Sequence, residues 1–265
     1  MPEVAYLQPR DLGDAVRLCR DTPDAKPLAG GTDLMVMLHA GTIRPRALVN
    51  LWSLRELQGI RHVDGALEIG AAEPYTGIIG SALVGEHCPA LVAASRTIGA
   101  AQIQNRGTLG GNLANASPAG DTLPVLLAAD AVVVTDRRAI PVADFFLGYR
   151  KTALRPGELI VAVRFPAAAR GVRFRKVGTR AAQAISKVVI AVNREPARVA
   201  LGSVAEVPLR ARGAEAALAR GDVEGAVMAV ASDIRPIDDV RSTAEYRRAV
   251  AQNVLRDLLH ASPRR

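Results

Sequence analysis

Apolar and polar positions alternate along the first fifty residues in a pattern that predicts short strands and helices in turn. Residues 4–50 fit one strand–helix–strand–helix–strand unit. Its first helix has Asp11 as the capping residue and runs to about Arg20. Residues 47–51 (ALVNL) form the last strand of the unit.

Residues 60–121 contain three successive patterns: a hairpin, a helical stretch and a polar stretch rich in glycine. Residues 60–71 predict a hairpin, because an Asp-Gly pair at residues 64–65 separates two alternating segments. Residues 77–101 have a helical pattern that breaks at Pro89. Residues 102–121 are dense in Gly, Asn, Ser and Thr, a composition that predicts tight extended turns with an exposed backbone.

Regular structure resumes in the second half of the chain. Residues 123–135 predict a helix and a strand, and residues 158–165 predict a further strand. Pro166 and the small residues after it mark a boundary, so we expect two lobes that divide near residue 168. The second lobe is expected to contain strands near 172–178, 187–193 and 197–205, then helices near 210–219, 222–231 and 243–260.

Composition and charge narrow the functional classes. The chain has 265 residues, of which 49% are hydrophobic and 23% charged, so it can bury a substantial core. A formal net charge of +8 would suit nucleic acid, but aromatic residues are only 3% and leave little surface for stacking on bases. The few lysines are scattered through the sequence, so no basic patch is indicated. We therefore expect no nucleic-acid partner.

Cysteine usage and hydropathy indicate a reduced cytoplasmic protein. Two cysteines, Cys19 and Cys88, are too few for a four-thiolate zinc or iron–sulfur site within this chain. The first residues contain early acids and no apolar core, unlike a signal peptide. The longest apolar run, 124–134, is interrupted by Asp130 and is too short for a membrane span.

Two glycine-rich segments carry the strongest chemical signal, 29–34 (AGGTDL) and 108–113 (TLGGNL). Paired glycines let a ligand approach the backbone, and free N–H groups at a helix start attract anions. The alternative for each pair is a turn that requires positive φ. Two such segments, followed by Asn112 and Asp121, favour a ligand with two phosphates, such as a dinucleotide.

Motifs of the common nucleotide-binding and hydrolytic classes are missing. The sequence contains no G-x-G-x-x-G fingerprint and no G-x-x-x-x-G-K-[ST] loop. It also lacks H-E-x-x-H and G-x-S-x-G, which leaves zinc hydrolysis and serine esterase chemistry unsupported. His87 and Cys88 are adjacent, an arrangement that seldom makes a thiolate–imidazole pair because neighbouring side chains usually point apart.

Three charged residues have two interpretations each. Lys176 and Lys187 lie eleven residues apart across a predicted hairpin, where they either reach a phosphate or flavin edge or stay solvated. Asp121 follows a polar segment and precedes an apolar helix, so it either caps that helix or binds a ribose hydroxyl.

Four ordered blocks together resemble the FAD-binding subunit of molybdenum hydroxylases. The blocks are AGGTDL, the long segment IGAAQIQNRGTLGGNLANASPAGDTLPVLLAADA, FFLGYRKTALRPGELI and FRKVGTRAAQAISKV, and the likeness continues into the last lobe. It covers essentially the whole chain. The resemblance implies an α+β fold: a two-subdomain FAD-binding domain of the vanillyl-alcohol oxidase (PCMH) type, at 1–168 with subdomains 1–51 and 52–168, and a smaller C-terminal α/β lobe at 169–265.

The resemblance also implies which residues contact FAD, with no catalytic acid or base and no metal ligand in this chain. These are Pro27, Leu28, Ala29, Gly30, Gly31, Thr32, Asp33 and Leu34 around the pyrophosphate, Thr108, Leu109, Gly110, Gly111 and Asn112 on its other side, Ile98 near the isoalloxazine ring, Asp121 on the ribose or adenine side, and Ile160 and Lys176 from later strands.

Membership of such a family implies an electron-transfer role within a complex. The partners would be a [2Fe-2S] small subunit and a molybdopterin large subunit on separate chains, with NAD, a quinone or oxygen as the external acceptor. The alternative is a stand-alone flavoenzyme that oxidises a small molecule directly on FAD, which would need the same glycine segments. Residues 192–197 (VNREPA) are shorter than the hairpin usual in the family, a difference that affects the expected partner surface.

Overall fold

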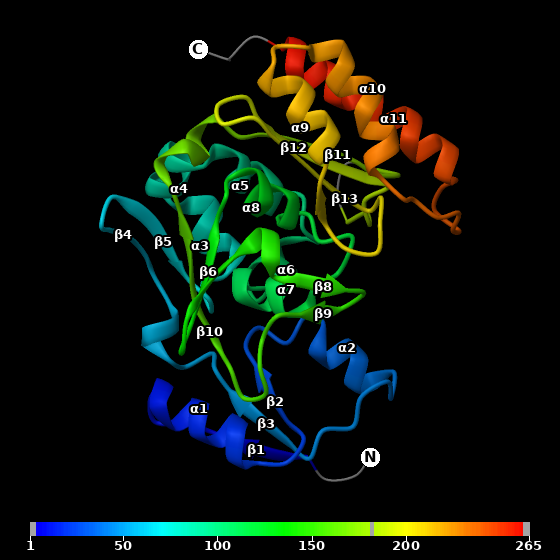
Figure 1. The fold of residues 1–265 in the computed structure, drawn as a ribbon. Helices are drawn as coiled ribbons and strands as arrows, with labels where there is room; N and C mark the ends of the chain where they lie inside the picture. The colour runs from blue at the N-terminus through cyan, green and yellow to red at the C-terminus, as the bar shows by residue number, and fades with distance from the viewer. Residues whose placement is uncertain (1–3, 181–182, 262–265) are drawn as a thin grey trace.

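The computed structural model describes residues 4–180 and 183–261. In Figure 1 a small sheet lies with α1 (Leu12–Asp21) and α2 (Leu34–His39) at one end of the molecule, and a sheet covered by longer helices lies at the other. A larger sheet with several short helices lies between them. Helices and strands are mixed throughout, so the expected α+β fold class is confirmed.

The first part is a three-stranded parallel sheet in the order β1-β3-β2. Its elements are β1 (Ala5–Leu7), α1 (Leu12–Asp21), β2 (Ala25–Leu28), α2 (Leu34–His39) and β3 (Ala47–Asn50). The side chain of Asp11 accepts a hydrogen bond from the Asp14 N–H at 2.7 Å, so it caps α1 as predicted. Ala15 of α1 and Val49 of β3 are fully buried in the small core between helix and sheet.

The middle sheet is antiparallel, in the order β4-β5-β10-β6-β7. Its strands are β4 (Ile60–Val63), β5 (Ala66–Gly70), β6 (Val132–Thr135), β7 (Ala139–Pro141) and β10 (Ile160–Phe165). Asp64 and Gly65 both have positive φ (52° and 77°), the geometry of a two-residue type I′ turn, so the predicted hairpin is confirmed. A separate two-stranded hairpin is formed by β8 (Phe146–Gly148) and β9 (Lys151–Thr152).

Short helices pack against the middle sheet. They are α3 (Tyr75–Gly80), α4 (Ala82–His87), α5 (Pro89–Ser95), α6 (Ala101–Gln104), α7 (Leu109–Asn115) and α8 (Leu123–Ala128), with single 3₁₀ turns at Arg55–Leu57, Val142–Asp144 and Ala167–Gly171. The helical pattern predicted over 77–101 therefore divides into three, with breaks at Ser81 and Cys88. The expectation of extended turns over 102–121 is wrong, because α6 and α7 occupy much of that stretch.

The last part is a four-stranded antiparallel sheet in the order β11-β12-β13-β14, followed by three helices. The strands are β11 (Arg173–Val177), β12 (Val188–Asn193), β13 (Arg198–Gly202) and β14 (Leu209–Arg210), and the helices are α9 (Arg212–Ala219), α10 (Val223–Asp233) and α11 (Ala244–His260). The three strands and three helices predicted here are confirmed to within a few residues, and β14 is an additional short strand.

The last sheet is covered on both faces. Its own helices cover one face, and helices of the middle part pack against the other and so join the sheet to the rest of the molecule. Val188, Ile190 and Val192 of β12 belong to the core formed with α9, α10 and α11. Ala191 of β12 and Ala200 of β13 belong instead to the core that contains α5 and α8. All of β12 is buried, as expected for a strand in the middle of three layers.

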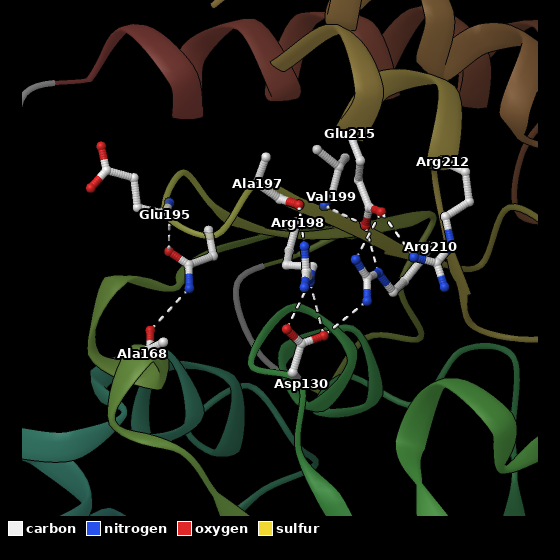
Figure 2. A network of polar contacts seen from close by, with 10 residues as sticks. Asp130, Ala168, Glu195, Ala197, Arg198, Val199, Arg210, Arg212 and Glu215 are labelled. Carbon is white, nitrogen blue, oxygen red and sulfur yellow. Dashed lines mark hydrogen bonds and ion pairs between the residues drawn. The ribbon is translucent and has the colours of Figure 1, made fainter. Parts of the chain in front are cut away.

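A network of charged groups also connects α8 to the last sheet (Figure 2). Asp130, in the turn after α8, accepts hydrogen bonds from Arg198 Nε at 2.7 Å and from Arg210 Nη1 at 2.8 Å. Arg210 also pairs with the buried Glu215 of α9 at 2.6 Å, and Glu215 accepts a hydrogen bond from the Val199 N–H.

No helix within the described residues combines the length and apolar character needed to cross a membrane.

Candidate cofactor site

A cavity of about 480 Å³ lies where the first part of the chain meets the middle sheet. Leu51, Leu57 and Ile160 form an apolar portion of its wall, and the backbones of residues 29–34 and 110–112 form another. We refer to it as the first cavity. Its volume is within the range typical of sites for small molecules and cofactors.

The first glycine turn, residues 29–34, presents unpaired backbone donors to this cavity. Gly31 has φ of +77°, a left-handed conformation that favours glycine. Gly30 is needed for a different reason, because a Cβ atom there would lie 1.6 Å from the Arg106 carbonyl oxygen. The N–H groups of Gly30, Gly31 and Thr32 have no hydrogen-bond partner among the described residues. They are therefore available to an anionic ligand.

The second glycine segment, residues 108–113, starts helix α7 and uses its own donors. The Gly111 N–H donates to Thr108 Oγ1 at 3.0 Å, so Thr108 caps the helix. The Gly110 N–H donates to the Ala71 carbonyl at 2.9 Å, and a Cβ atom at Gly110 would lie 2.7 Å from that oxygen. The N–H groups of Gly110 and Gly111 are therefore already used, and the absence of a side chain at Gly110 lets α7 pack closely on the sheet.

Asn112 is the residue of α7 best placed to meet a ligand. Its side-chain oxygen accepts a hydrogen bond from Thr122 Oγ1 at 2.8 Å, which fixes the orientation of the amide. The amide nitrogen has no acceptor among the described residues. Because Asn112 lines the first cavity, this nitrogen can donate to an oxygen of the ligand.

A second cavity, of about 440 Å³, continues from the first toward the last sheet. The two share the lining residues Asp33, Ile98, Ile103, Asn112, Asn115 and Arg150. They therefore form one elongated trough that runs between the parts of the molecule. An elongated space with apolar walls and with free N–H groups along its first cavity fits a flavin dinucleotide, which has aromatic ends and a central diphosphate.

Asp121 and Lys176 form a buried ion pair at the edge of the second cavity. The Lys176 Nζ donates to Asp121 Oδ2 at 2.6 Å and to the Thr97 carbonyl at 3.1 Å. Burial raises the pKa of Asp121, and the positive charge of Lys176 opposes that shift. The other carboxylate oxygen, Oδ1, is buried and has no hydrogen-bond partner among the described residues, so a ligand donor can satisfy it. Thr122 is the N-cap residue of α8, so Asp121 does not cap that helix.

The structure brings most of the predicted contact residues to the trough. All of them line the first cavity except Leu28, Leu109, Asp121 and Lys176. Leu109 is fully buried in the core, and Asp121 lines the second cavity. Lys176 reaches the trough only through Asp121.

Sequence reasoning missed three residues that line both cavities, Ile103, Asn115 and Arg150. Arg150 Nη1 donates to Asn115 Oδ1 at 2.6 Å, so the two side chains act together. Asn115 follows the second glycine segment on α7, and Arg150 lies within the block FFLGYRKT. That block contributed to the family resemblance, but nothing in its pattern indicates that its arginine turns toward α7.

Other candidate residues lie outside the trough. Cys19 and Cys88 are both free thiols, and burial raises the pKa of Cys88 to about 12, so it does not form a thiolate with His87. Lys187 Nζ lies 4.9 Å from the centre of the Tyr246 ring and lines neither cavity. Among the described residues no three side chains gather that could hold a metal ion.

Two family descriptions match the chain in succession. Residues 2–168 match the FAD binding domain in molybdopterin dehydrogenase, and residues 173–262 match the CO dehydrogenase flavoprotein C-terminal domain. Together they span nearly the whole sequence.

Individual relatives agree with this result. The carbon monoxide dehydrogenase medium chain of Hydrogenophaga pseudoflava is 32% identical, with 98% of this chain and 97% of that one covered. The xanthine dehydrogenase FAD-binding subunit of Escherichia coli O157:H7 is also 32% identical, with coverage of 96% and 94%. A crystal structure of the cyanide-inactivated Cu,Mo-CO dehydrogenase superposes with a TM-score of 0.89 at 30% identity, covering 97% of this chain and 96% of that one. The chain therefore belongs to the family of FAD-binding oxidoreductase subunits that includes the medium chain of carbon monoxide dehydrogenase and the FAD-binding subunit of xanthine dehydrogenase.

Proposed function

We propose that this chain is the flavin subunit of a multi-subunit molybdenum hydroxylase, which receives electrons from a partner subunit and delivers them to an external acceptor. The observation that carries the proposal is the trough, whose free N–H groups and apolar walls suit FAD, in a chain that aligns with medium chains over nearly its whole length. FAD, when bound, can take up electrons singly and release them as a pair.

The residues of the trough would bind and orient this cofactor. The N–H groups of Gly30, Gly31 and Thr32 are suited to the diphosphate, since each is free and lines the first cavity. The Asn112 amide would donate to an oxygen of the ligand beside them. Asp121, held by Lys176, offers the unpaired Oδ1 to a hydroxyl or ring N–H of the ligand.

The electron donors would be on other chains. A [2Fe-2S] cluster with four cysteine ligands needs more thiols than Cys19 and Cys88 supply, and these two are free thiols that line neither cavity. We therefore propose a [2Fe-2S] small subunit and a molybdopterin large subunit as partners, with NAD, a quinone or oxygen as the acceptor. The family matches meet between residues 168 and 173, which supports a division into domains 1–168 and 169–265.

Anaerobic reduction of the FAD-loaded chain tests the proposal against direct oxidation of a substrate. We expect a reduced [2Fe-2S] ferredoxin to bleach the flavin absorbance, and purines, aldehydes and N-heterocycles to leave it unchanged when no partner is present. Co-expression with the neighbouring genes should yield a complex that contains iron and molybdenum by metal analysis.

Two results would contradict the proposal. Rapid bleaching of the flavin by one of the small substrates in the purified chain would identify a stand-alone flavoenzyme. Failure of the purified chain to retain or rebind FAD would remove the basis of the site assignment altogether.

A further inference from the structure

Arg150 stands at the tip of the β8–β9 hairpin, where the two cavities join. It lines both of them, and its Nη1 donates to Asn115 Oδ1 at 2.6 Å. Asn115 is the last residue of α7, the helix that also presents Asn112 to the trough. The hydrogen bond therefore holds the guanidinium beside the middle of the trough, on the side where α7 ends.

Arg150 differs from the other charged residues that line the trough. The first cavity is lined by the charged residues Lys26, Asp33, Arg150 and Glu158, and the second by Asp33, Asp121 and Arg150. Glu158 is paired with Arg138 and Asp121 with Lys176, so these carboxylates are already neutralised. Among the described lining residues, Arg150 is the cation common to both cavities.

The backbone at this position is held in an uncommon conformation. Arg150 has φ of +53°, in the left-handed region that long side chains seldom adopt. The Tyr149 N–H donates to Glu206 Oε1 at 2.9 Å, which ties the hairpin tip to the loop after β13. Anchors at Glu206 and at Asn115 thus fix the tip from two sides. A conformation of this kind persists only where surrounding contacts hold it, and such residues cluster at ligand sites.

We propose that Arg150 is a further binding residue for the cofactor and neutralises the negative charge of its diphosphate. The proposal rests on the proposed function, since it takes FAD as the ligand of the trough. The diphosphate carries two negative charges, and the N–H groups of Gly30, Gly31 and Thr32 supply dipoles but no full charge. The planar guanidinium supplies that charge and can donate two parallel hydrogen bonds to phosphate oxygens. Glu206 acts as a positioning residue through the Tyr149 N–H.

Binding of matched ligands to the full-length apoprotein tests this role. We would compare FAD with riboflavin by flavin fluorescence, and ADP with adenosine by competition against FAD. In the variant R150Q the affinity for FAD and ADP should fall roughly 10- to 100-fold, the size expected for a lost charge-assisted hydrogen bond. The affinity for riboflavin and adenosine, which lack the diphosphate, should stay within about 2-fold of the wild type.

Two further variants separate charge from fold. R150K keeps the positive charge and should recover part of the affinity for FAD and ADP. K151Q removes the neighbouring exposed cation, which lines neither cavity, and should bind all four ligands as the wild type does. Thermal unfolding of the apoproteins should give the same transition for all variants.

The outcomes distinguish this inference from the function on which it rests. Equal losses of affinity for ligands with and without the diphosphate in R150Q would overturn the inference, as would unchanged affinity for FAD and ADP. A wild-type chain that binds neither FAD nor ADP would instead overturn the proposed function.

Discussion

At the scale of single residues, the glycines around the trough serve different purposes. Gly31 adopts a positive φ, whereas Gly30 and Gly110 allow two stretches of backbone to touch. Both close contacts are to a carbonyl oxygen, on Arg106 and on Ala71 respectively. A carbonyl in the backbone cannot turn away as a flexible side chain can, so a Cβ atom at either glycine would force the backbone to move.

The contact at Gly30 gives a first prediction. In Gly30→Ala the new Cβ atom must push the glycine turn away from Arg106, which should lower the free energy of unfolding by about 1–3 kcal/mol and weaken FAD binding. Gly85→Ala is the control, because a Cβ atom at Gly85 in α4 meets nothing within 4 Å and should stabilise the helix by about 0.5–1 kcal/mol. Urea unfolding and FAD titration measure both. Wild-type stability in Gly30→Ala would show that the turn can move without cost.

Glu158 gives a prediction about pH. Burial alone would raise the pKa of this carboxyl, but hydrogen bonds from Arg138, the Arg155 N–H and Thr135 outweigh burial and hold its pKa at about 2. A carboxyl with a lowered folded-state pKa stabilises the protein above its unfolded pKa, and the stabilisation disappears as the pH falls. Glu158 should therefore contribute about 1–3 kcal/mol at neutral pH that is lost between about pH 5 and about pH 2.

The variant Glu158→Gln tests this contribution. Urea unfolding at a series of pH values should show a shallower loss of stability on the acid side than in the wild type, because glutamine does not titrate. Glu86→Gln, at an exposed position of α4, should keep the wild-type slope. Parallel curves for Glu158→Gln and the wild type would mean that the buried carboxylate does not control acid stability.

At the scale of elements, the start of α7 depends on Thr108. Its hydroxyl caps the helix by accepting the Gly111 N–H at 3.0 Å, and the residue is buried. Thr108→Ala should cost about 1 kcal/mol of unfolding free energy and weaken FAD binding, since Asn112 follows in the same turn. Thr108→Ser keeps the acceptor and should lose much less. Equal losses in the two variants would assign the effect to the missing methyl group instead of the cap.

Helix α7 is also the clearest example of an element that the sequence did not predict. The strand–helix unit at residues 4–50, the Asp-Gly hairpin and the last lobe have strong periodicity or turn signals, and all were predictable. Helix α7 was not, because Gly110, Gly111 and Asn112 favour turns in isolation. Its stability comes from the Thr108 cap and from the backbone contact with Ala71, and the second of these is tertiary.

Some residues of the candidate site could also be predicted from the sequence, and others could not. Glycine pairs are visible in the sequence, so residues 29–34 and 110–112, which line the first cavity, could be predicted as candidate site residues before the fold was known. Two pairings could not be predicted, because their partners are distant along the chain. Asp121 meets Lys176 across 55 positions, and Arg150 meets Asn115 across 35.

At the scale of the whole molecule, Asp130 of the first lobe forms ion pairs with Arg198 and Arg210 of the last lobe, as Figure 2 shows. In Asp130→Asn, Arg210 retains Glu215, whereas Arg198 loses its carboxylate. We expect a loss of about 0.5–1 kcal/mol, since Arg198 and Asp130 are both partly exposed. A double-mutant cycle with Arg198→Gln measures the coupling. A coupling energy of zero would show that the Arg198–Asp130 ion pair does not help to hold the lobes together.

Apolar packing between the lobes gives the last prediction. Ala191 and Ala200 are paired across β12 and β13 and belong to the core of α8, so two small side chains let the helix lie close to the sheet. Ala200→Leu should force α8 away from the sheet, at a cost of about 1–3 kcal/mol. Asp121 precedes α8 and Lys176 lies on β11 of the same sheet, so the shift should also separate this ion pair and weaken FAD binding.

Ala249→Leu, at an exposed position of α11, is the matched control and should leave both properties unchanged. Urea unfolding and FAD titration of the two variants separate stability from binding. If Ala200→Leu lost stability but bound FAD as tightly as the wild type, the trough would be independent of the contact between the lobes. A joint loss would instead show that the interface between α8 and the last sheet sets the shape of the second cavity, because the mutated side chain itself lines neither cavity.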